Sequence, residues 1–365
     1  MAHTLSTTKL AKAATIVANE LFTPSFTSTP LFDLAFRLGR VFPVDAGVVN
    51  IPVLGVKESL QTVAAYGQWT TATSNSLVAY QVQLWDSCTY PVKIDERHIG
   101  INDESKLENL QQAMQYGVSG LLDRVQYAFF NSAYNAYDGS AYNKPFAGIN
   151  NALPMGATGT YYGIDRGVAT NALHFYANAS AHGGGASANS TKFSTDATGF
   201  LPLLREARVQ AQSRGASHMV CFVDPTTAGF FGRYADANRL TSVSQTPTWV
   251  PNEIKNNNLS VGAIGYSIYL WDDVLIVPVS GIDTTYTNGY LVPMKVNGQP
   301  NLLIPYTKPN SGITGKKLYP FVSFSPWNCT DRSWTWESAA WANFSIVIGD
   351  LSVCATIKHD GTYSA

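Results

Sequence analysis

Charged side chains are scarce in this chain of 365 residues, because Asp, Glu, Lys and Arg together make up 13%, about half of the roughly 25% typical of soluble domains. Basic and acidic residues nearly balance, at 24 and 25, which gives a formal net charge of −1. The chain therefore lacks the basic excess with which a protein neutralises many nucleic-acid phosphates. We expect neighbouring subunits to cover much of this weakly charged surface, although a neutral surface rich in Ser, Thr, Asn and Gly also stays soluble.

Long apolar runs and clustered cysteines are also missing. No stretch approaches the roughly 20 apolar residues that a membrane helix requires, so no membrane partner is expected. The short apolar run at 13–18 is followed at once by polar residues and fits an amphipathic helix rather than a secretion signal. The cysteines have neither metal-ligand nor redox spacing, which predicts reduced thiols. They are Cys88, Cys221, Cys329 and Cys354.

Motifs for catalysis and cofactor binding are absent as well. There is no Gly-x-Ser-x-Gly turn for a serine nucleophile, no phosphate-binding loop and no dinucleotide fingerprint. The histidines lack the paired spacing of a metal site; they are His3, His98, His174, His182, His218 and His359. Asp272 and Asp273 could bind a divalent ion, but adjacent acids between two predicted strands are typical of a solvated turn. We therefore expect no enzymatic activity, no metal and no other cofactor.

A long amphipathic helix is predicted for residues 104–131 and would span about 40 Å at the standard rise. Its apolar residues recur at three- and four-residue steps; they are Leu107, Leu110, Met114, Val118, Leu121, Leu122, Val125 and Phe129. Asn102 or Asp103 can cap its first turn. A helix of this length indicates a beam in an extended molecule rather than one element of a compact enzyme core.

Three shorter elements follow the beam. Residues 196–214 have the pattern of a second helix, which Gly215 is placed to terminate. The unbroken apolar run Met219 to Val223 predicts a strand that is buried on both faces. Asp224 and Pro225 then supply an N-cap and a first helical residue, so this strand is expected to lead directly into a short helix.

Strand-like segments lie on both sides of this helical middle. Residues 41–54 and 78–94 alternate like the two arms of a hairpin around a polar tip at 58–77. Further strands are predicted at 262–269, 274–279, 290–296, 302–306, 343–348 and 351–357, the last two joined by a tight turn at 349–350. An isolated two-stranded arm is marginally stable, so we expect the hairpin to rest on a neighbouring subunit.

Tryptophans near the C-terminus suggest an alternative function. Trp334 and Trp336 would share one face of a strand, as a carbohydrate-stacking platform requires, with Trp327 and Trp341 close in sequence. Buried or inter-subunit aromatic clusters are commoner. A carbohydrate-binding or tail-associated β-rich module is therefore kept as the alternative.

The order of these elements resembles a known family. A helical N-terminal arm, a long hairpin, a spine helix, the phrase Pro145-Phe146-Ala147-Gly148-Ile149, a second helix and a buried strand running into Val223-Asp224-Pro225 resemble the Hong Kong 97-type major capsid protein of tailed bacteriophages. The resemblance implies an α+β, Hong Kong 97-like capsid fold. Its parts would be an N-terminal arm (1–44), an extended β-hairpin loop (45–87), a peripheral domain with the spine helix (88–200 and 320–365) and an axial domain (201–319).

The same resemblance implies a structural function. The chain would be a virion protein, a major head protein that is assembled in the host cytoplasm and forms hexamers and pentamers of an icosahedral head around double-stranded DNA. An encapsulin-type nanocompartment shell shares this fold and stays open. Portal and decoration proteins are expected partners, with DNA contacts weak and non-specific. Because the chain starts at Met1 and shows no long scaffolding segment, a scaffold is expected either to be a separate protein or to be unnecessary.

The tip of the extended loop supplies the candidate inter-subunit contacts. Its scattered apolar residues are too few to form a core of their own. The candidates are Lys57, Leu60, Val63, Tyr66 and Trp69. Some members of the resembled family join a loop lysine to an asparagine of a neighbouring subunit. Only Lys57 can be matched to that pattern in this chain, so we expect a noncovalent shell.

Overall fold

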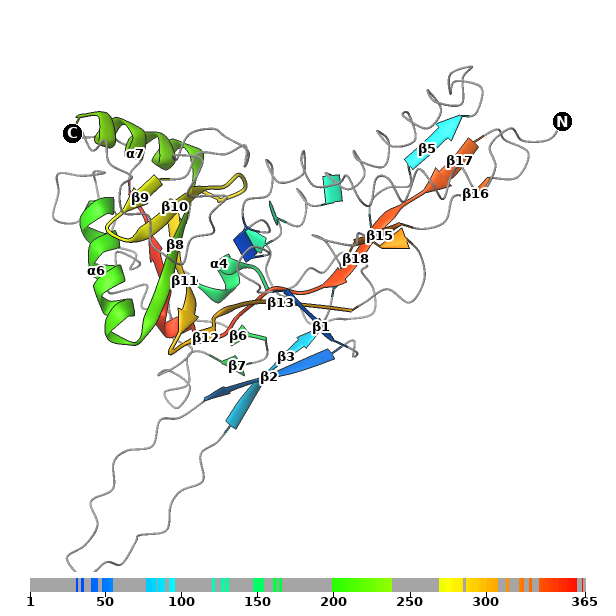
Figure 1. Cartoon of the computed structure of the whole chain (residues 1–365), viewed down its shortest axis with the longest axis horizontal. Coiled ribbons are helices and arrows are strands. Elements are labelled where there is room, and N and C mark those ends of the chain that lie inside the picture. Colours follow the sequence, from blue (N-terminus) through cyan, green and yellow to red (C-terminus); the bar gives the residue numbers. More distant parts are fainter. Residues whose placement is uncertain are drawn as a thin grey trace, which may run out of the picture.

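The computed structural model describes residues 31, 34–35, 41–44, 48–54, 77–83, 85–88, 92–95, 120–121, 126–127, 129–130, 147–153, 160–162, 164–165, 199–237, 269–284, 287–307, 313–314, 322–324, 328–329, 335–359 and 363. These residues form mixed sheets with few helices (Figure 1). The two longest helices among the described residues and a six-stranded sheet lie at one end of the molecule.

The six-stranded sheet is built around β8, which lies between a parallel and an antiparallel neighbour. Its strands are β8 (Ala216–Val223), β9 (Tyr269–Trp271), β10 (Val274–Pro278), β11 (Gly289–Val296), β12 (Gln299–Pro300) and β20 (Ala355–Ile357). The order is β12-β11-β8-β10-β9, with β20 also paired to β11. β8 runs parallel to β10 and antiparallel to β11. This position confirms the prediction that 219–223 is a buried strand, since all five residues are at most 3% exposed.

Helices cover both faces of this sheet. Phe222 and Tyr290 are register partners on one face, and the ring of Phe130 lies 5.7 Å and 6.4 Å from theirs. Gly289 lies on the opposite face, where a Cβ atom would be 2.8 Å from Cζ of Phe200. Phe200 is the first residue of α6 (Phe200–Ser213). The sheet is therefore covered by α6 on one side and by helical residues 129–130 on the other, which explains why the part of β8 at 219–223 has no polar face.

α6 ends and α7 begins where their capping residues place them. α6 starts after Gly199, a few residues later than predicted, and Gly215 follows its C-cap with a φ of 84° in the left-handed region that glycine tolerates. α7 (Pro225–Ala237) opens as predicted. Asp224 Oδ1 accepts hydrogen bonds from the backbone N–H groups of Thr226 and Thr227 at 2.9 and 3.2 Å. The side chain therefore satisfies two donors that a helix start leaves free.

A second, elongated sheet extends away from this end (Figure 1). It contains β1 (Val41–Val44), β4 (Trp85–Cys88), β13 (Leu302–Thr307), β14 (Ile313–Thr314), β15 (Val322–Phe324), β18 (Ala340–Phe344) and β19 (Val347–Ile348). A three-stranded sheet joins β16 (Asn328–Cys329), β17 (Thr335–Ser338) and β5 (Val92–Asp95), and β6 (Thr160–Tyr161) pairs with β7 (Ile164–Asp165).

This arrangement corrects the predicted hairpin arms. The segments 41–54 and 78–94 are not two continuous strands, because each is divided among different sheets. β1 pairs parallel with β13, β4 with β18 and β5 with β17. Only β2 (Val48–Leu54) and β3 (Leu77–Gln83) pair with each other. Alternation revealed extended backbone in both arms but could not reveal which strand each piece would join.

The predicted C-terminal hairpin is also wrong. Residues 351–353 form a 3-10 turn rather than a strand, because Asp350 Oδ1 accepts from the backbone N–H of Ser352 at 2.8 Å and caps it. After this turn β20 pairs with β11 in the first sheet, whereas β19 pairs with β13 in the second. The chain therefore crosses between the sheets at 349–354.

Asn301 holds this crossing together. Its side-chain carbonyl accepts from the backbone N–H of Asp350 at 2.6 Å, and its amide donates to the carbonyl of Pro293 in β11 at 3.1 Å. The residue is 2% exposed and lies between β12 and β13. One buried side chain thus links the end of the first sheet to the start of the second.

Part of the predicted spine helix falls within the described residues. Positions 120–121, 126–127 and 129–130 are helical, and Leu121 and Phe129 are buried as their spacing predicts. The continuous helix over 104–131 stays a prediction, since its other residues lie outside the described ranges. The short helix α4 (Ile149–Ala152) packs nearby in the core. None of the helices in the described ranges is long and apolar enough to span a membrane.

Candidate functional site

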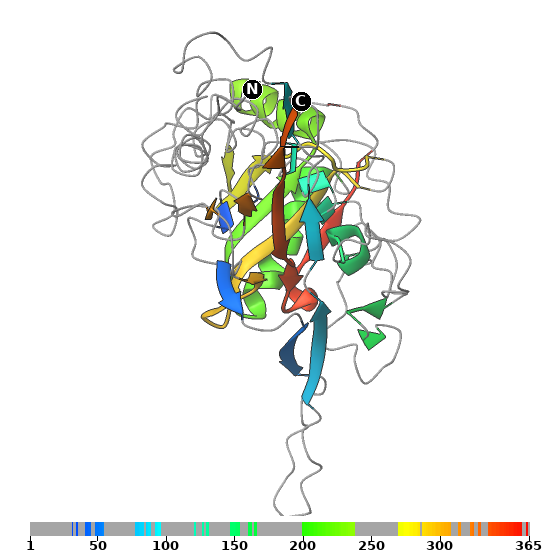
Figure 2. The ribbon, with the colours of Figure 1, turned by 90° about the vertical axis from the view of Figure 1, so that its right-hand side faces the viewer.

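The β2–β3 ribbon projects from the molecule and holds the two ends of the segment with the predicted subunit contacts (Figures 1 and 2). The strands pair in unbroken antiparallel register from Val48 opposite Gln83 to Leu54 opposite Leu77. The candidates Lys57, Leu60, Val63, Tyr66 and Trp69 all lie between these strands, outside the described residues. Their role in subunit contact therefore stays a prediction.

A buried polar network occupies the end of β8 and the start of α7. Thr227 Oγ1 donates to Asp224 Oδ2, and His359 Nε2 lies 2.7 Å from the same hydroxyl. The amide of Asn288 donates to Asp224 Oδ2 at 3.4 Å, and its carbonyl accepts from the backbone N–H of His359 at 2.8 Å. All four residues are at most 5% exposed.

The arrangement of donors assigns a role to each atom of this network. A threonine hydroxyl has one proton, and Thr227 gives it to Asp224, so His359 Nε2 must be the donor to Thr227. The imidazole lies 5.6 Å from the rings of both Phe200 and Phe230. Because these groups are enclosed by aromatic side chains and satisfied by one another, the network fastens the C-terminal segment to α7. It does not offer a nucleophile to a substrate.

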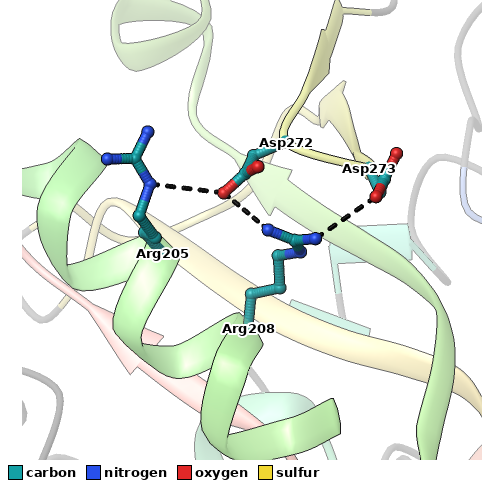
Figure 3. Close-up of polar contacts among 4 residues, drawn as sticks. All are labelled: Arg205, Arg208, Asp272 and Asp273. Carbon is teal, nitrogen blue, oxygen red and sulfur yellow. Dashed lines mark hydrogen bonds and ion pairs between the residues drawn. The ribbon is translucent and has the colours of Figure 1, made fainter. Parts of the chain in front are cut away.

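A second polar cluster lies at the surface, where α6 meets the β9–β10 turn (Figure 3). Arg208 donates to both acids of the turn, with Nη1 2.6 Å from Asp272 Oδ2 and Nη2 3.2 Å from Asp273 Oδ2. Arg205 Nε lies 3.3 Å from Asp272 Oδ2, and its guanidinium carbon lies 5.1 Å from the centre of the Trp271 ring. Two arginines of one helix thus clamp two adjacent aspartates.

The backbone conformation confirms that Asp272 and Asp273 form a turn between two strands. Both have positive φ, 51° and 64°, and they connect Trp271 directly to its register partner Val274. A two-residue hairpin loop with both φ values positive is the type I′ turn, which Asn-Gly usually occupies. The acids are therefore turn residues held by arginines. Sequence analysis did not single out Arg205 and Arg208, although three-residue spacing already places them on the same helix face.

Two cysteines lie in the core of the first sheet and are free thiols, as predicted: Cys221 in β8 and Cys354 before β20. Burial raises the pKa of the Cys221 thiol far above its usual range. Burial, and then the charge of Asp350, raise the pKa of Cys354, while a hydrogen bond from Asn301 opposes the shift. Neither thiol forms a reactive thiolate at neutral pH. Cys88 and Cys329 lie in strands β4 and β16.

Within the described residues, no group of three or more His, Cys, Asp or Glu side chains is placed to hold a metal ion. The tryptophans considered for carbohydrate binding are divided between sheets, with Trp336 in β17 and Trp341 in β18. Trp334 and Trp327 lie outside the described residues, so the shared face of Trp334 and Trp336 stays a prediction.

Comparisons by sequence find nothing similar to this chain: no family model matches it, and no curated protein does. Comparisons by structure do find similar proteins. A chain of the cyanophage A-1(L) capsid superposes with a TM-score of 0.57 at 11% identity, covering 91% of this chain and 93% of that one. A chain of the holo-SrpI encapsulin complex from Synechococcus elongatus PCC 7942 gives 0.49 at 12% identity, covering 89% and 87%. A capsid chain of a native GTA particle gives 0.48 at 10% identity, covering 90% of both chains.

The cyanophage superposition is the one of these three that exceeds 0.5, and it extends over nearly the whole of both chains. At 11% identity it is evidence about fold and not about sequence descent. The mixed sheets with few helices therefore constitute a capsid-type fold, which confirms that part of the sequence prediction.

Proposed function

We propose that this chain is the major capsid protein of a tailed bacteriophage. Its copies would assemble into the hexamers and pentamers of an icosahedral head that encloses double-stranded DNA. The observation that carries the proposal is the superposition on the cyanophage A-1(L) capsid chain over 91% of this chain. The low share of charged residues, 13%, supports it, because a surface so poor in charge suits burial between subunits.

In such a ring of subunits, each part of the chain would have its own position. The axial domain, 201–319, would meet its copies around the ring centre, and the peripheral domain would form the outer part. The β2–β3 ribbon would extend its tip, with Leu60, Val63, Tyr66 and Trp69, onto an adjacent subunit. A two-stranded ribbon cannot bury a core of its own, so a neighbour supplies the missing surface.

Electron microscopy of the purified protein tests the proposal. The wild-type chain, expressed with its scaffold if the genome encodes one, should form closed particles, and a monodisperse monomer under assembly conditions would contradict this. Boiling the particles in detergent and reductant should release single chains, because we propose a noncovalent shell. Genomic neighbours separate a phage head from an encapsulin shell, since a portal and a terminase accompany the first and a cargo enzyme the second.

The ribbon tip offers a second test. Residues 55–76 replaced by Asn-Gly would join the register partners Leu54 and Leu77 through a two-residue type I′ turn. The variant should keep the circular dichroism spectrum and melting temperature of the wild-type subunit, while its particles should be lost. Normal assembly, or outright unfolding, would show that the tip is not an inter-subunit element.

Weak contact with DNA follows from the charge. With a net charge of −1, free subunits should bind duplex DNA weakly at physiological salt, because few phosphates can be neutralised. A filter-binding or fluorescence anisotropy titration over a range of salt concentrations measures this. Tight binding with a steep salt dependence would show that the shell holds DNA by neutralisation rather than by confinement.

A further inference from the structure

We propose that the outer face of α6, together with the β9–β10 turn, is a contact surface for a second copy of this chain. The surface is formed by Arg205, Val209, Trp271 and Asp273, and we call it the α6–turn surface. The inference rests on the proposed shell function and goes further by naming the residues that meet and the charges that pair.

On this surface an exposed hydrophobic side chain lies beside exposed charged side chains. Val209 is 54% exposed, and apart from Tyr127 it is the one large hydrophobic residue so exposed in the described ranges. It lies one helical turn after Arg205 and therefore on the same face of α6. The side chains of Arg205 and Asp273 are 63% and 69% exposed, and Trp271 is half-buried beneath the Arg205 guanidinium.

Both exposed charges retain unused bonding capacity. Arg205 uses only Nε, toward Asp272, and its two terminal nitrogens point away from that acid and have no partner in the part of the chain that the structure describes (Figure 3). Asp273 uses Oδ2, toward Arg208, and its other oxygen likewise has no partner there. A guanidinium with two free amino groups is suited to a second carboxylate.

The charges of this cluster indicate which kind of partner the α6–turn surface would bind. Two arginines and two aspartates make the cluster neutral as a whole, so neither a purely anionic nor a purely cationic partner is favoured. A second copy of the chain offers an unused aspartate oxygen to the unused arginine nitrogens and an apolar residue to an apolar residue. Arginine and tryptophan are also the side chains most enriched in interface hot spots.

In a ring, the contact would be heterologous: Arg205 of one copy would pair with Asp273 of the next, and the same pair would repeat around the ring. Arg208, with its side chain 16% exposed, would stay within its own chain and hold the turn in position. The alternative is that the cluster serves only to fasten the turn to α6, in which case no charge crosses between copies.

A charge-exchange experiment decides between these roles. Arg205→Glu and Asp273→Arg each place like charges opposite one another in a ring of identical copies, whereas alternating the two variants restores an opposite pair at every contact. Each variant alone should lower the particle yield by about tenfold or more, and mixing the two should restore six-membered rings. Five-membered rings should stay defective, because an odd ring cannot alternate. Glu206→Arg is the control, since it makes the same charge change as Asp273→Arg at an exposed residue of α6 that lies outside the surface.

The outcomes are separable by electron microscopy and by thermal melting of the unassembled subunits. If wild-type chains form no particles, the proposed function itself fails. If wild type assembles and each variant assembles equally well, the α6–turn surface is not a contact. If each variant fails and mixing does not rescue six-membered rings, the cluster acts only within one chain, because a defect inside a subunit cannot be repaired by its neighbour.

Discussion

Replacing Asp224 with alanine should destabilise the unassembled subunit by about 2–4 kcal/mol, mostly through hydrogen bonds left unmade rather than through lost volume. The carboxylate accepts from the backbone N–H groups of Thr226 and Thr227, and losing an N-cap costs about 1 kcal/mol. It also accepts from the Thr227 hydroxyl and the Asn288 amide, both buried. Each donor left without a partner costs about 1–3 kcal/mol. The energy of desolvating the carboxylate is recovered on its removal and offsets part of that sum.

Urea denaturation followed by circular dichroism measures this loss. Thr226→Ala is the matched control, because Thr226 is exposed, lies in the same helical turn and contributes only its backbone N–H to the network. The control should stay within about 0.5 kcal/mol of wild type. Thr227→Val keeps the side-chain volume while removing the hydroxyl that bridges Asp224 and His359, and should cost about 1–3 kcal/mol.

The double variant tests the reasoning most directly. Asp224→Ala and Thr227→Val share a hydrogen bond, so together they should cost about 1 kcal/mol less than the sum of the single changes. Strict additivity would show that the two groups do not act as one network. An Asp224→Ala subunit as stable as the Thr226→Ala control would refute the claim that the buried carboxylate is needed by its donors.

Three further outcomes are expected. Gly289→Ala should lower the melting temperature markedly, because its Cβ would lie 2.8 Å from Phe200 Cζ. Combining it with Phe200→Leu should recover part of that loss. An unchanged melting temperature of Gly289→Ala would contradict this close approach. Cys221 and Cys354 should resist iodoacetamide at pH 7–8 in the native subunit and react with it after denaturation without reductant. Mass spectrometry measures the labelling, and labelling of the native subunit would mean that the thiols are not buried. Asn301→Ala should lower the free energy of unfolding, measured by urea denaturation, by about 2–3 kcal/mol. The reason is that the N–H of Asp350 and the carbonyl of Pro293 lose the Asn301 side chain as a partner. A loss below about 0.5 kcal/mol would contradict the role of Asn301 between the sheets.

Local patterns predicted the elements around β8 well. The apolar run at 219–223, the Asp224-Pro225 helix start and the Gly215 helix end each depend on residues a few positions apart, and such short-range effects are encoded by spacing and capping chemistry. The Asp272-Asp273 turn was predicted on the same basis. The predicted strand pairing was wrong at 41–54, 78–94 and 351–357. Alternation of apolar and polar residues specifies which face of a strand is buried, and it does not specify which strand is the pairing partner.

The sequence by itself therefore determined most of the extended and helical segments among the described residues, the absence of known cofactor motifs and the low share of charged side chains. Only the tertiary structure decided which distant residues meet. His359 lies against Thr227 across 132 positions, and Arg205 reaches Asp272 across 67. The physical reason is that a buried or exposed polar group is satisfied by whatever donor or acceptor the packing of helices on sheets brings within about 3 Å, and that proximity is a property of the whole fold.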